Sequence, residues 1–219
     1  MTLIQRQPRP LTRDTDSFRD DRLFYVACDD TFAPEQYFGL FQLRRVRIHV
    51  VPTPSDGSSA ASHVLARLLS FEHEEDDERW MLLDADHYVQ GAHLASFMDA
   101  LREAKRQGVN VALSRPSFEL WLLLHHVEET DLGPLPTTKH AEEALRARLG
   151  QYNKTNLKRE HYPVASIRDA YERAARLDAT VAGGDIPSDN TTRVYLLLKA
   201  LVSKALPLQL PPELRGLLR

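Results

Sequence analysis

The sequence has little cysteine, no long apolar run and no strong charge of either sign. Its 219 residues include one cysteine, which excludes an intramolecular disulfide and a cysteine-based zinc cluster. No apolar run approaches the roughly 18 to 20 residues that a membrane-spanning helix needs. The first residues also lack the apolar stretch of a signal peptide. We therefore expect a cytoplasmic protein with no membrane partner.

The formal net charge of -3 argues against a protein that coats nucleic acid unspecifically, because such binding comes mainly from neutralising phosphates. The charge is unevenly distributed along the chain. Residues 71–110 hold ten acids and four bases, whereas residues 111–219 hold fifteen bases and thirteen acids. Nucleic acid therefore stays a candidate partner, although the composition does not require it.

The first half of the chain alternates short apolar runs with amphipathic stretches, which predicts strands alternating with helices. The expected strands cover residues 22–28, 45–51, 79–86 and 109–114. The expected helices cover residues 34–43, 59–72 and 91–108. This order predicts an α/β fold with about four mainly parallel strands, covered by helices on both faces.

The second half of the chain has a helical pattern. Helices are expected within residues 117–127, 139–152, 166–180 and 190–204. We expect three parts: a flexible N-terminal arm, an α/β core, and a helical C-terminal extension packed on that core. Their expected ranges are residues 1–20, 21–125 and 126–219.

Acidic residues follow two of the expected strands: Asp29 and Asp30 after the first, Asp84 and Asp86 at the end of the third. The carboxyl ends of parallel strands meet at one edge of a sheet, so these side chains should lie close together. Residues i and i+2 of an extended segment point the same way, so Asp84 and Asp86 should face one point. Converging carboxylates repel unless a cation or proton lies between them, and oxygen ligands favour Mg²⁺ or Mn²⁺. The alternative is that Asp84 and Asp86 only end the strand and cap the next loop.

The stretch SRPSFELWLLLHH, residues 114–126, is unusually apolar around a single acid. Glu119 lies near the expected helix start, where it either complements the helix dipole or takes part in catalysis. The run LWLLL predicts a buried helix. His125 is a candidate substrate contact, but a histidine on a core helix more commonly has a structural role.

Two basic residues of the second half are candidates for binding phosphate. Lys154 lies in QYNKTN, and Arg193 follows Asn190 and Thr191 at an expected helix start. Helix N-termini with nearby cations suit phosphate groups. Solvated lysines and surface caps are the alternative for both segments.

With these motifs the chain resembles the RloB-like family, which accompanies restriction and phage-defence genes and is related to Toprim domains. Its most specific match is SRPSFELWLLLHH, which is similar to the family's Ser-x-Pro-x-Phe-Glu-x-Trp-x-Leu-Leu-His signature. LLDADHY resembles the D-x-D segment, and YNK with NTTRVYLLLKAL resembles the C-terminal half. The resemblance extends from about Arg22 to Lys204.

The first motif departs from the family pattern. The family has Cys-Glu-Gly, followed by Thr-Glu and Tyr-Phe, whereas this chain has CDDTFAPEQYF. Cys28, Tyr37 and Phe38 are kept, and Asp29 stands at the position of the first glutamate. Aspartate keeps the charge on a side chain one methylene shorter, and Glu35 is shifted by one residue from the second glutamate.

The resemblance implies a Toprim-like fold and a nuclease that hydrolyses phosphodiester bonds of DNA or RNA with Mg²⁺ or Mn²⁺. In that interpretation Asp84 and Asp86 hold the metal, and Asp29 ligates it or shuttles a proton. Glu119 completes the acidic cluster.

For substrate and partners, the resemblance implies that Lys154 and Arg193 bind the nucleic-acid backbone, with His125 as a further contact. It also implies antiviral defence by abortive infection, with an ATPase partner from the same locus.

Two other functions fit parts of the sequence. The altered first motif also suits a catalytically degenerate Toprim-like subunit that docks on a defence ATPase or acts as a sensor. An LDAD segment after a strand also occurs in nucleotide-sugar glycosyltransferases, where it binds a divalent ion with a diphosphate. In this chain the acidic CDD at the end of the first strand would repel that diphosphate.

Overall fold

The structure is a computed structural model. It describes residues 22–30, 32–41, 43, 46–53, 59–86, 88, 93–182 and 184–218. The expected N-terminal arm, residues 1–20, lies outside the described residues.

The first half of the chain forms four strands alternating with three helices. The strands are β1 (Arg22–Cys28), β2 (Val46–Val51), β3 (Glu78–Asp84) and β4 (Asn110–Arg115). The helices are α1 (Ala33–Gly39), α2 (Ala61–Leu69) and α3 (His93–Arg106). Each strand lies within two residues of its predicted range, because its apolar run is bounded by polar or turn-forming residues.

The second half is helical apart from one short strand. Its helices are α4 (Glu119–Leu123), α5 (Thr138–Leu149), α6 (Val164–Thr180), α7 (Val194–Lys204) and α8 (Pro212–Arg215). The 3₁₀ turns are Glu129–Asp131, Arg159–His161, Pro207–Gln209 and Gly216–Leu218. The sequence did not predict the two-residue strand β5 (Thr191–Thr192), which lies directly before α7.

The strands form one sheet in the order β2-β1-β3-β4-β5. β1 pairs in parallel with β2 and β3, and β3 pairs in parallel with β4. β5 pairs antiparallel with the end of β4, where Ser114 is opposite Thr192. The predicted α/β fold with a mainly parallel sheet is confirmed, with five strands in place of about four.

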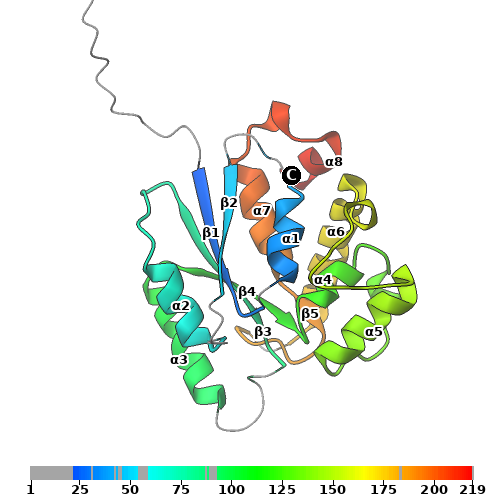
Figure 1. Cartoon of the computed structure of the whole chain (residues 1–219), viewed down its shortest axis with the longest axis horizontal. Helices are drawn as coiled ribbons and strands as arrows, with labels where there is room; N and C mark the ends of the chain where they lie inside the picture. Colours follow the sequence, from blue (N-terminus) through cyan, green and yellow to red (C-terminus); the bar gives the residue numbers. More distant parts are fainter. Residues whose placement is uncertain are drawn as a thin grey trace, which may run out of the picture.

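Helices cover both faces of the sheet (Figure 1). α2 and α3 pack on one face, where Val64, Leu68 and Phe97 contact Met81 and Leu83 in one apolar cluster. α1, α4, α6 and α7 lie on the other side of the sheet in Figure 1.

The second apolar cluster, on that other face, is the larger one and joins both halves of the chain. It includes Phe24 of β1, Trp121 of α4, Leu197 of α7 and Leu214 of α8. Parallel strands with both faces covered are buried through their length, which explains the almost continuous apolar runs of β1 and β3. No helix in the described part of the chain is long and apolar enough to cross a membrane.

Candidate active site

A cavity of about 460 Å³ opens at the carboxyl ends of β1 and β3. We call it the acidic cavity, because four carboxylates line it. Its lining residues are Asp29, Asp30, Ser59, Ala60, Asp84, Tyr88, His93, Glu119, Thr138 and Lys154. They come from both halves of the chain, and the sheet brings them together because its parallel strands end at one edge.

Asp29 is fixed by backbone hydrogen bonds at the end of β1. Its Oδ2 accepts a hydrogen bond of 2.8 Å from the amide of Asp84, and its Oδ1 accepts one of 3.0 Å from the amide of Asp30. The parallel pairing of β1 with β3 places these two strand ends side by side. The sequence-based prediction that Asp29 and Asp84 lie close together is confirmed.

Asp84 and Asp86 have different hydrogen-bond partners. Asp84 Oδ1 accepts a hydrogen bond of 2.9 Å from the amide of Phe118, and Asp84 lines the acidic cavity. Asp86 Oδ2 accepts from the amide and the hydroxyl of Thr138, at 3.1 and 2.6 Å. Asp86 is not among the lining residues of the acidic cavity, but its partner Thr138 is, and the charge of Asp86 raises the pKa of Asp84, so the two acids lie near each other. Asp86 also holds the first turn of α5, where a carboxylate is favourable.

Glu119 is the most deeply buried acid of the cavity, with 2% of its surface exposed. Its Oε2 accepts a hydrogen bond of 2.7 Å from the Ser117 hydroxyl, and its Oε1 accepts one of 2.9 Å from the Tyr152 hydroxyl. It lies in the first turn of α4, so both sequence-based roles, at the helix start and in the acidic site, fit its position.

Burial and mutual repulsion disfavour negative charge in this cavity. Burial raises the pKa of Asp84 well above its usual range, and the charges of Asp29 and Glu119 raise it further. Burial also raises the pKa of Asp29 to about 7, although the backbone amide of Asp84 acts in the opposite direction. The pKa of Glu119 is raised by burial against the lowering effect of its two hydroxyl donors. A group of this kind gains from a proton or a cation.

Lys154 is the basic residue at the rim of the acidic cavity. Its Nζ lies 3.7 Å from Oδ1 of Asp30, and 44% of its side chain is exposed. The carboxamide of Gln36 in α1 fixes the surrounding loop, because it donates to the carbonyl of Lys154 and accepts from the amide of Leu157, both at 2.7 Å.

The structure does not bring His125 to the acidic cavity. His125 is 4% exposed, and its two ring nitrogens hydrogen-bond with the Tyr37 hydroxyl at 3.0 Å and the Ser166 hydroxyl at 2.8 Å. Burial lowers the pKa of His125 to about 3, so the ring is neutral at physiological pH.

Arg193 also lies away from the acidic cavity. It donates to Asp178 at 3.1 Å and to the carbonyls of Asp185 and Gly184 at 3.0 and 2.7 Å. It lines a different cavity, together with Asn110 at the start of β4. Its backbone lies beside the carboxyl end of β4, since its amide donates to the carbonyl of Leu113 at 2.8 Å, but its guanidinium is held by Asp178 and by the carbonyls of residues 184 and 185.

The carboxylates of the acidic cavity suit a divalent cation by their chemistry. Among the described residues, no group of three or more His, Cys, Asp or Glu side chains is arranged to hold a metal ion. Mg²⁺ commonly takes only one or two protein carboxylates and completes its shell with water and phosphate oxygens. Asp84 meets that requirement, because its Oδ2 accepts no hydrogen bond from any described residue.

Several cavity residues escaped the sequence analysis. Tyr88 stacks on Phe97 and donates to the carbonyl of Ser59 at 2.7 Å, which closes one wall of the cavity. Tyr152 could have been predicted as a site residue, because it is the first residue of the YNK segment that resembles the family. Nothing in the sequence pointed to Tyr88 or Thr138, because a tyrosine or threonine in a loop is common.

The chain matches one family model, described as RloB-like protein, over residues 24–201. No curated protein and no solved structure matches it. The matched segment extends from β1 to α7 and contains every residue that lines the acidic cavity. The chain therefore belongs to the RloB-like family.

Proposed function

We propose that this protein is a metal-dependent nuclease, which hydrolyses phosphodiester bonds of DNA or RNA in a bacterial anti-phage system. One observation carries the proposal: Asp29, Asp84 and Glu119, from three separate stretches of the chain, line one cavity with Lys154 at its rim. Acidic groups with raised pKa values in a cavity are typical of catalytic sites. The Toprim-like chemistry and the defence role rest on the family resemblance.

Each residue of the cavity has a distinct role in this proposal. Asp84 would hold Mg²⁺ or Mn²⁺, with Asp29 beside it. A bound divalent cation neutralises charge on the phosphate and helps to activate the attacking water. Asp29 takes up or releases a proton close to neutral pH, because its pKa is about 7. Lys154 offsets the repulsion between the acidic cavity and an anionic substrate.

The test is a cleavage assay with purified protein, using labelled DNA and RNA, single- and double-stranded, with Mg²⁺, Mn²⁺ or EDTA. We expect cleavage that requires the metal and falls by about 10²-fold or more in Asp84→Asn, because one preorganised charged group is removed from the site.

The matched control is Asp99→Asn, the same chemical change on the exposed surface of α3. It should cleave like the wild-type protein. Equal activity of the Asp84→Asn and wild-type proteins would mean that the observed cleavage comes from a contaminant or another site.

A second candidate function is a catalytically degenerate subunit or sensor that works with a defence ATPase. The position of Asp29 favours it, because both carboxylate oxygens already accept backbone hydrogen bonds. If the second candidate is correct, the wild-type protein cleaves no substrate with either metal but co-purifies with an ATPase from its native host. Metal-dependent cleavage by the isolated protein would contradict it.

A further inference from the structure

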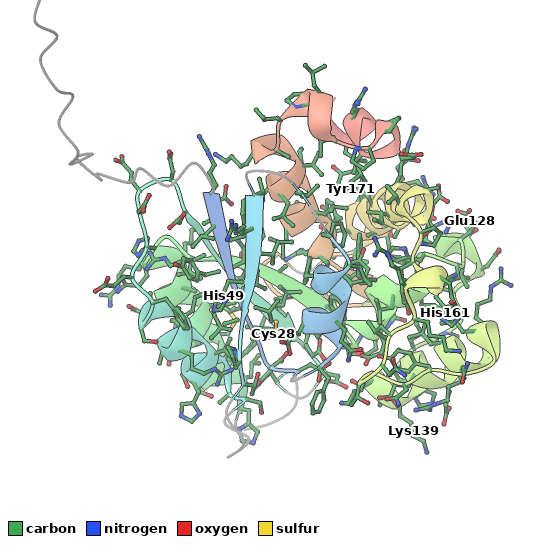
Figure 2. The ribbon with its side chains drawn as sticks, turned by 45° about the horizontal axis from the view of Figure 1, so that its top comes forward. Cys28, His49, Glu128, Lys139, His161 and Tyr171 are labelled. Atoms are coloured by element: carbon green, nitrogen blue, oxygen red, sulfur yellow. The ribbon has the colours of Figure 1, made fainter. Side chains whose placement is uncertain are left out.

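A second, smaller cavity is lined by residues of the loop that carries Lys154 and by the 3₁₀ turn that follows it. Its volume is about 200 Å³, below the roughly 300 to 1,000 Å³ of pockets for drug-sized ligands. We call it the amide recess, and its lining residues are Gln151, Tyr152, Asn153, Asn156, Leu157, Lys158, His161 and Tyr162. Figure 2 places His161 on the C-terminal helical side of the molecule, apart from Cys28 at the end of β1.

The lining of the amide recess differs in kind from that of the acidic cavity. None of its described residues is acidic, and three of them carry carboxamides. The carboxamides of Gln151 and Asn156 each offer a donor and an acceptor, the combination that reads the edge of a base, whereas Oδ1 of Asn153 already accepts from Thr155. Tyr152 and Tyr162 add aromatic rings, on which unpaired bases stack in proteins that bind single strands.

The recess also carries one cationic side chain. Lys158 lines it and forms no hydrogen bond or ion pair with a described residue. A lysine without an acidic partner beside amides and aromatic rings suits a phosphate-bearing ligand.

The two cavities share a wall. Tyr152 lines the recess, and its hydroxyl donates to Oε1 of Glu119, which lines the acidic cavity. Lys154, two residues further along the chain, lines the acidic cavity. Two residues span at most about 7 Å, so the two cavities are neighbours.

The loop that separates the two cavities is held in place. Its turn is closed by the hydrogen bond from the amide of Asn156 to the carbonyl of Asn153, at 3.0 Å. Gln36 binds the loop at Lys154 and Leu157 with both ends of its carboxamide. The recess and the acidic cavity therefore keep a fixed relation, as recognition of two neighbouring groups of one ligand requires.

We propose that the amide recess binds an unpaired base of a nucleic-acid strand whose neighbouring phosphate lies in the acidic cavity. This inference rests on the proposed function and specifies its substrate as single-stranded or locally unpaired nucleic acid. A base in a duplex is stacked on both faces and paired at its edge, so it can enter such a recess only when unpaired.

The test measures binding in EDTA, so that it is independent of cleavage. Labelled single strands of DNA and RNA, the matching duplexes, and single strands with abasic positions are titrated with the full chain. We expect single strands to bind at least about tenfold more tightly than duplexes and abasic strands, because base stacking and amide contacts are lost in the latter two. An abasic strand that binds as tightly as the normal strand would overturn the proposal, since only phosphates would be recognised.

Two variants locate the binding on the protein. Asn156→Ala and Lys158→Ala should each lower affinity for single strands by about five- to tenfold, and Asn156→Ala should leave affinity for the abasic strand unchanged. Lys199→Ala, which removes one exposed charge from α7, is the matched control for Lys158 and should change affinity less than about twofold. Thermal melting of each variant checks the fold. Unchanged single-strand affinity in both recess variants would place the binding elsewhere, whereas tight binding without metal-dependent cleavage would contradict only the nuclease.

Discussion

At the residue scale, the two oxygens of Asp84 have different surroundings. Oδ1 accepts the amide hydrogen of Phe118, while Oδ2 has no hydrogen-bond donor among the described residues. Burial and the surrounding acids penalise the negative charge of Asp84, which the proposed cation would offset. Active sites with destabilising arrangements of charge commonly lower the stability of the folded protein.

Asp84→Asn should stabilise the metal-free protein and abolish cleavage. The amide oxygen can keep the hydrogen bond from Phe118, and the neutral amide removes repulsion with Asp29 and Glu119. We expect a gain of about 1 to 2 kcal/mol in the free energy of unfolding, or about 3 to 6 °C in melting temperature. Thermal melts in EDTA measure it, with Asp99→Asn expected within about 0.5 kcal/mol of wild type.

The pH dependence of this gain is a further check. The folded-state pKa values of Asp29 and Asp84 are both raised, so the stability linked to their protonated forms is present below their unfolded pKa values of about 4. It is lost as the pH rises through the folded pKa values, which for Asp29 is about 7. The difference between Asp84→Asn and wild type should therefore be small near pH 4 and increase toward pH 8. A difference that does not vary with pH would mean that electrostatic repulsion is not its cause.

His125→Ala should destabilise the fold without changing affinity for nucleic acid in the folded protein. The substitution removes a buried ring and its hydrogen bonds with Tyr37 and Ser166, which costs about 2 to 4 kcal/mol. Chemical denaturation and oligonucleotide titration measure the two effects separately. His63→Ala, on the exposed side of α2, is the control and should alter neither. A selective loss of affinity in His125→Ala would instead support the substrate contact predicted from the sequence.

The sequence predicted that Asp29 and Asp84 lie close together, because each ends an apolar run and the two runs form neighbouring parallel strands. It could not predict the hydrogen-bond partner of Asp86, which is Thr138, 52 residues later. It also gave no reason to separate Arg193 from Lys154, since both lie near polar loop residues. Side-chain positions beyond a strand end depend on contacts distant in sequence, which local patterns do not contain.

At the element scale, α5 ends at a residue that requires the left-handed conformation. Gly150 caps the helix with a φ of 74°. Gly150→Ala should lower the free energy of unfolding by about 1 to 2 kcal/mol, because a β-carbon is unfavourable at positive φ. Thermal or chemical denaturation measures the loss.

Gly39→Ala in α1 is the matched control. At neither glycine does an added β-carbon come within 4 Å of atoms beyond the adjoining backbone, and of the two only Gly150 has a φ in the left-handed range. Alanine at position 39 should leave stability unchanged or raise it by up to about 1 kcal/mol, because it favours the helix. Equal losses at both positions would contradict a conformational cause at Gly150.

The elements themselves were predicted better than the site. β1 matches its predicted range, since a β-rich run of seven residues meets two aspartates. β5 was missed because two residues, Thr191 and Thr192, carry no periodicity and are strand only through pairing with β4. α4 is shorter than expected, because the residues after Leu123 continue as turns that the apolar pattern does not distinguish from helix.

At the scale of the whole molecule, both halves of the chain share one core. Phe24, Trp121 and Leu197 belong to the same buried cluster, so the expected core and C-terminal extension have a common apolar interior. We expect a single cooperative unfolding transition, in which the calorimetric and van't Hoff enthalpies agree. Differential scanning calorimetry tests this. Two separate transitions would mean that the extension folds as an independent unit.

Tyr152 lines the amide recess, and its hydroxyl donates to Glu119, which lines the acidic cavity. A ligand that turns this ring changes the proton affinity of Glu119, and a charge placed beside Glu119 changes how firmly the ring is held. Thermodynamic linkage makes such an effect reciprocal: whatever factor one occupant imposes on the affinity of the other, it receives in return. If the recess binds a base as proposed, the phenolic proton of Tyr152 would couple that binding to the charge state of Glu119.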